Sequence, residues 1–228
     1  MRTPVHFIPI LTTLVAIPFA ITLFRHWRAT RGLHVLWWAV GVALYGVGTF
    51  TESAVTLLGW SPPLFRAWYI SGALLGGAPL AQGTVYLLHS RRFANLTAAL
   101  LVTAVLVASS FVLLTPIDMS LVEPHRLSGR VMEWQWVRLF SPFINTYAFI
   151  FLVGGALVSA WRYRSQRDSA HRVIGNTLIA AGAILPGIGG TATRMGHTEV
   201  LYVAELVGLL LIWWGYRWNV RGPVQVGS

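Results

Sequence analysis

The chain has 228 residues, of which 55% are hydrophobic and only 11% are charged. Soluble domains carry roughly a quarter charged residues, so this composition excludes an ordinary soluble domain and is typical of a membrane protein. The formal net charge of +10 comes entirely from arginines that flank apolar stretches. This placement favours membrane lipids over nucleic acid as the partner, and no nucleic-acid binding is expected.

Seven apolar segments are each long enough for a transmembrane helix, which needs roughly 20 residues. In chain order the predicted helices cover about residues 6–25, 33–58, 62–89, 94–115, 134–162, 171–194 and 198–218. The first segment is expected to be a retained helix and not a signal peptide, because its positive charges follow the apolar run. The predicted fold is therefore all-α: a polytopic membrane protein with one seven-transmembrane-helix domain at 1–218 and a short tail at 219–228.

The distribution of arginines predicts the orientation of the helices. Eleven arginines fall beside one set of helix ends and six beside the other. By the positive-inside rule, the N-terminus is expected outside and the C-terminus in the cytoplasm. The one sizeable loop, residues 116–133, would then lie outside, and its prolines and glycine suggest a short interfacial helix.

Prolines and small residues inside the segments predict kinks and close helix packing. Kinks are expected where proline removes a backbone donor, at Pro18, Pro79, Pro142 and Pro186. Small residues at packing spacing let helix backbones approach closely, and they occur at Gly72 and Gly76, along Gly41–Tyr45–Gly48 and along Gly182–Pro186–Gly190. Polar residues within spans, such as Gln82, Thr84 and Asn176, are expected to bond across helices.

Two carboxylates inside the spans are the first candidates for function, because charges in a bilayer are costly. Glu52 precedes the outer end of the second helix by about six residues, and Glu205 follows the outer start of the seventh by about seven, so both lie about 10 Å below the outer surface. Arginines and other polar side chains approach the same layer. The predicted ligand-binding residues, from helices two, three, five, six and seven, are Glu52, Arg66, Tyr69, Arg138, Asn145, Arg194, Tyr202 and Glu205.

This layer has two interpretations. It is either an outward-facing polar pocket for a small molecule or a lipid headgroup, or a set of interhelical Glu–Arg pairs that lock the bundle. A pair between Glu52 and Arg66 is expected, since a tight Pro62–Pro63 turn joins their helices.

Several chemistries are not expected. Without lysine the chain cannot form a retinal Schiff base, and without cysteine it has no disulfides or thiolate ligands. Three histidines, His34, His89 and His171, fall at predicted cytoplasmic helix ends, where imidazoles could bind Zn²⁺ or haem. No carboxylate or HExxH-like spacing accompanies them, so neither a metal nor a cofactor is expected. No nucleophile–base pair or phosphate loop is found, which argues against an enzyme.

Residues 36–90 resemble the second and third helices of the seven-helix sensor region of some bacterial histidine kinases. The residues that carry the resemblance are Trp37, Trp38, Gly41, Gly46, Glu52, Trp60, Arg66, Tyr69, Gly72 and Pro79. The resemblance implies ligand sensing in a bacterial membrane. Because those receptors continue into kinase or cyclase domains and this sequence does not, it also implies output through a separate partner.

Together these observations predict a multi-pass protein of the cell membrane that acts as a receptor-like or ligand-binding module. One alternative is a small transporter or an ion- or proton-conducting subunit, in which Glu52 and Glu205 handle the cation. Another is a structural subunit of a membrane complex, with aromatic residues such as Trp213 and Trp214 packed on a neighbour.

Overall fold

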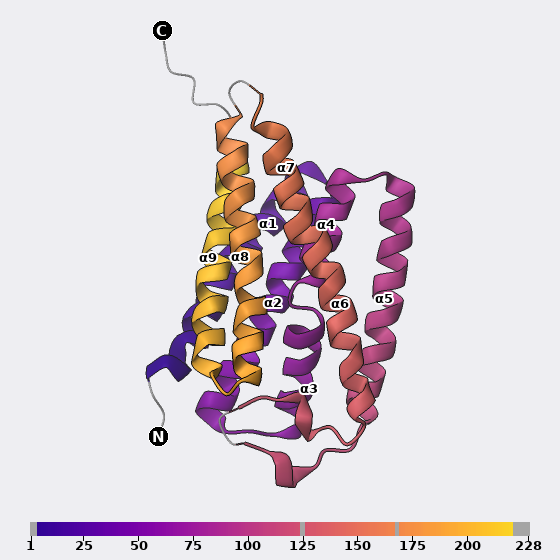
Figure 1. Ribbon diagram of the computed structural model, residues 1–228, viewed down its shortest axis with the longest axis vertical. Helices are drawn as coiled ribbons and strands as arrows, with labels where there is room; N and C mark the ends of the chain where they lie inside the picture. The colour runs from indigo at the N-terminus through magenta and orange to yellow at the C-terminus, as the bar shows by residue number, and fades with distance from the viewer. Residues whose placement is uncertain (1–3, 124–125, 167–168, 221–228) are drawn as a thin grey trace.

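The computed structural model describes residues 4–123, 126–166 and 169–220, and the side chain of Arg194 also lies outside the description. The described chain is all-α, and all seven predicted segments are helical (Figure 1). Six of them are long and apolar enough to cross a membrane, which makes the protein a multi-pass membrane type. They are Pro4–Thr30, Leu33–Leu58, Arg91–Leu114, Gln135–Tyr163, Ala170–Thr193 and Thr198–Val220.

The first two helices form an antiparallel pair with a tight corner. A short 3-10 turn, η1 (Pro4–Phe7), leads into α1 (Ile8–Thr30), and α2 spans Leu33–Leu58. The corner is closed at Arg31, which adopts a left-handed conformation (φ 54°) and donates its N–H to the carbonyl of Trp27. At the far end α2 stops at Gly59, whose φ of +94° suits glycine.

The third segment is broken, and the prediction of one continuous helix over 62–89 is wrong. It consists of α3 (Pro62–Trp68), a π-helical turn η2 (Tyr69–Leu74) and α4 (Ala78–Leu88). Pro79 has no N–H to continue the ladder, so it sits in the first turn of α4. Because of the break, the carbonyl of Ala73 does not take part in a helical hydrogen bond. Instead it accepts hydrogen bonds from Ser141 Oγ (2.8 Å) and Asn145 Nδ2 (3.2 Å). A neighbouring helix thus satisfies the freed backbone group.

The remaining helices follow the predicted order with shifted ends. They are α5 (Arg91–Leu114), η5 (Gln135–Leu139), α6 (Phe140–Ala148), a π-helical turn η6 (Phe149–Gly154), α7 (Gly155–Tyr163), α8 (Ala170–Arg194) and α9 (Thr198–Val220). Pro142 lies in the first turn of α6, three residues after the 3-10 turn η5 ends, and the kink expected there stays a prediction. The described parts of the loop, residues 116–123 and 126–133, hold two 3-10 turns, η3 (Met119–Leu121) and η4 (Gly129–Val131), where a short interfacial helix was expected.

The helices form a bundle in which α2 and α4 lie between α8 and α9 on one side and α5 on the other (Figure 1). Helices α8 and α9 pack closely against each other and meet through glycines. A Cβ added to Gly208 would lie 2.6 Å from the carbonyl oxygen of Gly182. Gly215 and Gly175 meet in the same way, with a corresponding distance of 2.5 Å. Of the other predicted glycines, Gly48 faces Gly72: a Cβ added to Gly48 would lie 3.1 Å from Cα of Gly72, as close packing of small residues requires.

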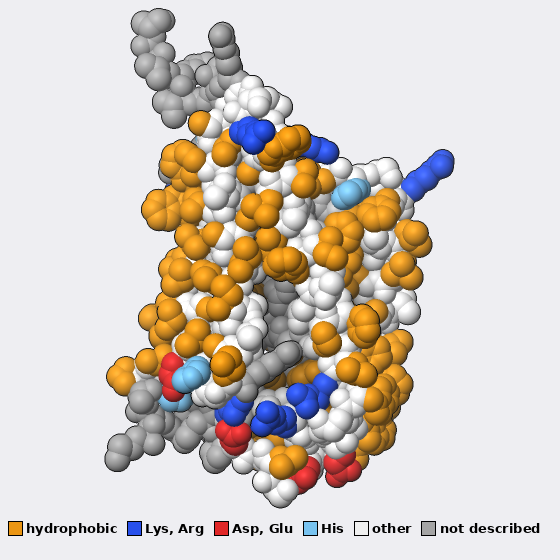
Figure 2. Space-filling view, in the orientation of Figure 1, with side chains coloured by type: hydrophobic (Ala, Val, Ile, Leu, Met, Phe, Trp, Pro, Cys, Tyr) orange, Lys and Arg blue, Asp and Glu red, His pale blue; other side chains and the backbone are white. Residues whose placement is uncertain are grey.

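Two ends of the bundle carry different chemistry. On the face shown in Figure 2, hydrophobic side chains cover the middle, and charged side chains gather towards the two ends. We call the end formed by residues 116–139 the loop end; η1 lies there as well (Figure 1). The opposite end carries Arg28, Arg91, Arg92, Arg162, Arg164 and Arg172, and we call it the arginine-rich end.

Candidate functional site

The loop covers the helices at the loop end. Its residues Leu127, Val131 and Met132 are buried and pack with Phe65 and Tyr69 in one apolar cluster. Gly129 lies directly on this surface, since a Cβ added there would be 2.9 Å from Cε2 of Tyr69 and 3.5 Å from Cγ of Arg138. Tyr69 and Arg138, both predicted to bind a ligand, therefore contact the loop.

The arginines of the predicted layer are engaged with backbone and loop groups. Arg66 Nη2 donates to the carbonyl of Thr115 (3.0 Å), and Arg138 Nη1 donates to Oε1 of Gln135 (2.7 Å). Within the described ranges Glu52 and Arg66 form no ion pair, so the pair expected between them is not present. Asn145 bonds to the freed Ala73 carbonyl, a bracing role, and the side chain of Arg194 lies outside the described residues.

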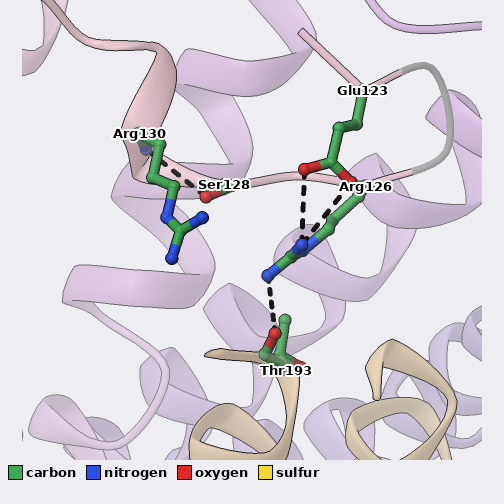
Figure 3. Close-up of polar contacts among 5 residues, drawn as sticks. All are labelled: Glu123, Arg126, Ser128, Arg130 and Thr193. Atoms are coloured by element: carbon green, nitrogen blue, oxygen red, sulfur yellow. Dashed lines mark hydrogen bonds and ion pairs between the residues drawn. The ribbon is translucent and has the colours of Figure 1, made fainter. Parts of the chain in front are cut away.

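One ion pair is found in the described part of the chain, and it belongs to the loop (Figure 3). Arg126 lies 3.3 Å from Oε1 of Glu123, and its Nη2 donates to the carbonyl of Thr193 at 2.6 Å. A cation at the carboxyl end of α8 complements the helix dipole. Nearby, Ser120 donates from its hydroxyl and its N–H to Asp118, and these hydrogen bonds lower the pKa of that carboxyl below its usual value.

Three of the predicted residues do come together: Glu52, Tyr202 and Glu205. Glu52 is 3% exposed, and Oε1 of its carboxyl group accepts from the indole N–H of Trp68 at 2.9 Å. The carboxyl groups of Glu52 and Glu205 lie within hydrogen-bonding reach of each other. Tyr202 is buried beside both of them and packs edge-on against His6, with ring centroids 6.2 Å apart. The equal depth expected for the two carboxylates is thus reflected in a contact.

Both acidic side chains keep an unsatisfied oxygen. Oε2 of Glu52 and Oε2 of Glu205 are buried, and no N–H or O–H of another described residue reaches either atom. Two ionised carboxylates cannot hydrogen-bond to each other, because both are acceptors only. The contact between them therefore becomes a hydrogen bond only if one carries a proton.

Replacing Trp68 by Phe is expected to destabilise the bundle by about 1–3 kcal/mol, because it leaves Oε1 of buried Glu52 without its donor. Unfolding of the purified protein in detergent, followed by circular dichroism, measures the change. Trp214→Phe is the matched control, since Trp214 is 60% exposed. Equal stability of the two variants would show that the indole hydrogen bond contributes nothing.

A cavity of about 360 Å³ lies towards the arginine-rich end, away from the predicted layer. Its wall is mostly apolar and comes from six helices, through residues that include Leu23, Trp38, Leu80, Leu152, Ile179 and Ile212. A second cavity of about 280 Å³ shares Thr84, Leu88 and Gly155 with it. Of the eight predicted ligand-binding residues, the seven whose side chains the structure describes line neither cavity.

Polar side chains are also found in the wall of the larger cavity. Nδ1 of His26 and the hydroxyl of Tyr216 are 2.5 Å apart. Arg172 donates to the hydroxyl of Tyr163 at 2.8 Å and lies 4.8 Å from the centre of its ring. An apolar wall with a few polar groups is the composition of a small-molecule site.

Some features of this cavity are partly visible in the sequence. The in-span polar residues Thr84 and Asn176 line it, although they were expected only to bond across helices. On α7 the small residues Gly155, Ala156 and Ser159 leave the space that larger side chains would fill. Their spacing places them on one helical face, but only the neighbouring helices decide that this face meets a void.

The three histidines do not form a metal centre. His34 lines the larger cavity and His89 the smaller one. Over residues 4–123, 126–166 and 169–220, no group of three or more His, Cys, Asp or Glu side chains could hold a metal ion.

Comparisons with protein-family models, curated proteins and solved structures gave no match for this chain. The assignment of function therefore depends on the geometry above.

Proposed function

We propose that the protein is a receptor-like module of the cell membrane that binds a mostly apolar small molecule or lipid in the larger cavity. The observation that carries the proposal is the cavity itself, about 360 Å³ with an apolar wall and a few polar groups. Sites for small molecules span roughly 300–1,000 Å³, so the space suits a compact ligand or one acyl chain.

The polar groups indicate what the ligand carries. The guanidinium of Arg172 supplies a positive charge, and His26 and Tyr216 form a hydrogen-bonded pair. An anionic or hydrogen-bonding head could approach these groups while an apolar body fills the remainder. The expected ligand is thus amphipathic, with the chemistry of a fatty acid.

The position of the cavity supports a sensing role. Its wall takes residues from α1, α2, α4, α7, α8 and α9, so an occupant contacts most of the bundle at once. A ligand shifts a conformational equilibrium only by differential contacts with the two states, and contacts with many helices allow such differences. The resemblance of residues 36–90 to seven-helix sensor regions agrees with this proposal, with output through a separate partner.

Transport is the second candidate, because the buried Glu52–Glu205 pair has no described cation beside it. Intramembrane carboxylates mark ion and proton pathways in other proteins. Vesicles that contain the protein and a trapped pH dye separate the two candidates. A proton leak that Glu205→Gln abolishes would favour transport over sensing.

Photolabelling with palmitic acid that carries a diazirine on its chain tests the ligand site. We expect labels on residues of the cavity wall. Ser159→Phe places a large side chain in that wall and should reduce the labelling about tenfold, which corresponds to a loss of about 1.4 kcal/mol of binding free energy. Mass spectrometry of the digested protein, purified in detergent, maps the labels.

Leu157→Phe is the matched control, because Leu157 is on the same helix, is 51% exposed and lies outside both cavities. Competition by free palmitate or by vesicles of phosphatidylglycerol distinguishes a free amphiphile from a membrane lipid as the occupant. Labels confined to outward-facing residues such as Leu157, and equal in both variants, would contradict the proposal.

A further inference from the structure

The Glu52–Glu205 pair links two helices that are distant in the sequence. Glu52 is in the last two turns of α2 and Glu205 is in the second turn of α9. The hydroxyl of Tyr45, two turns before Glu52 on α2, donates to the backbone carbonyl of Glu205 at 3.0 Å. The helices are therefore held together at this level by the Tyr45 hydrogen bond as well as by the contact between the two acids.

Among the described side chains, no cation forms an ion pair with Glu52 or Glu205. From α3, Trp68 offers a neutral donor, and Arg66 is directed to the carbonyl of Thr115. From α2 and α9, Tyr45 and Tyr202 are the titratable neighbours, and His6 of η1 packs on Tyr202.

The other packed helices add few charges. The basic residues of α1 lie in its last two turns, towards the arginine-rich end of the bundle. Helix α8 ends at Arg194, whose side chain lies outside the described residues. Two ionised carboxylates in contact repel each other, and burial removes the water that would screen them. A proton placed between them removes one charge and supplies the missing donor for an orphaned oxygen.

We infer that Glu52 and Glu205 form a proton-binding site that holds one shared proton between their carboxyl groups. The proton comes from solvent water; the O–H of one acid donates to an oxygen of the other, and the pair keeps a single negative charge. Trp68 remains the donor to Oε1 of Glu52. The shared proton joins α2 to α9 whether or not the cavity binds a ligand.

Infrared spectroscopy of the full chain in lipid vesicles at neutral pH tests this inference. The wild type is expected to show the carbonyl stretch of a protonated carboxyl group, and this band should shift in D₂O. Both Glu52→Gln and Glu205→Gln should remove the band, because the new amide N–H can donate to the remaining carboxylate. Glu199→Gln, an exposed acid on the same helix, is the matched control and should leave the band in place.

The inference fails if the wild type shows no protonated carboxyl band, a result that needs no variant to fold. It also fails if the band persists in either glutamine variant. Glu205→Asp, which keeps the acid but shortens its reach, guards against misfolding: it should retain the band at a shifted frequency. An unshifted band in that variant would place the proton elsewhere.

Discussion

Ser120→Cys is expected to react with a membrane-impermeant maleimide added to intact cells, whereas Ser165→Cys reacts only after the membrane is opened. Ser120 is exposed in the loop, and Ser165 is exposed between α7 and α8 at the arginine-rich end. The positive-inside rule assigns the arginine-rich end to the cytoplasm. The difference should be all or none, since the reagent cannot cross the bilayer.

The native chain is the control for this experiment, because it has no cysteine and cannot be labelled. Mass tagging on a gel gives the fraction labelled before and after permeabilisation. Labelling of both positions from outside would mean an even number of crossings between them. Reversed accessibility would place the loop end in the cytoplasm and overturn the proposed orientation.

Replacing Gly208 by Leu is expected to destabilise the bundle by about 3 kcal/mol, towards the upper end of what overpacking costs. A Cβ there would lie 2.6 Å from the carbonyl oxygen of Gly182, a backbone atom that moves only if α8 moves. The two helices must separate along a seam that also contains Gly175 and Gly215. Reversible unfolding in mixed micelles, followed by tryptophan fluorescence, gives the free-energy difference.

Gly187→Leu on α8 provides the comparison, because nothing lies within 4 Å of a Cβ added there. It should change the free energy of unfolding by roughly 0.5 kcal/mol or less, as substitutions away from packed contacts do. If the two leucine variants were equally stable, the glycine seam would not determine the approach of α8 and α9.

Much of the architecture was predictable because it depends on local properties of the chain. Hydropathy over about 20 residues located all seven segments. Small-residue spacing correctly marked Gly182, Gly48 and Gly72 as contact points, but it could not separate them from Gly190, which faces open space. Spacing gives a helical face, and only the neighbouring helix decides whether that face is covered.

The third helix shows where local reasoning stopped. Pro79 was correctly predicted to disrupt the helix. However, a proline at this position is compatible either with a kink or with a full break and a π-helical turn, and the sequence does not distinguish the two. The break is stabilised by Ser141 and Asn145, which are about 70 residues away in sequence and donate to the freed carbonyl of Ala73. Those long-range hydrogen bonds offset the cost of an unpaired backbone group.

The amino-acid sequence alone was enough to predict a helical, apolar, membrane-type chain with seven segments and two carboxylates at a similar level. The length of a segment, its charge and the position of a residue along a helix axis follow from counting residues along the chain, so no knowledge of the neighbouring helices is needed. The tertiary structure decided which side chains meet: Trp68 and not Arg66 for Glu52, a loop over Tyr69, and a cavity beside Ser159. These contacts depend on how each helix is rotated about its axis and where it packs, which is set by all its neighbours at once.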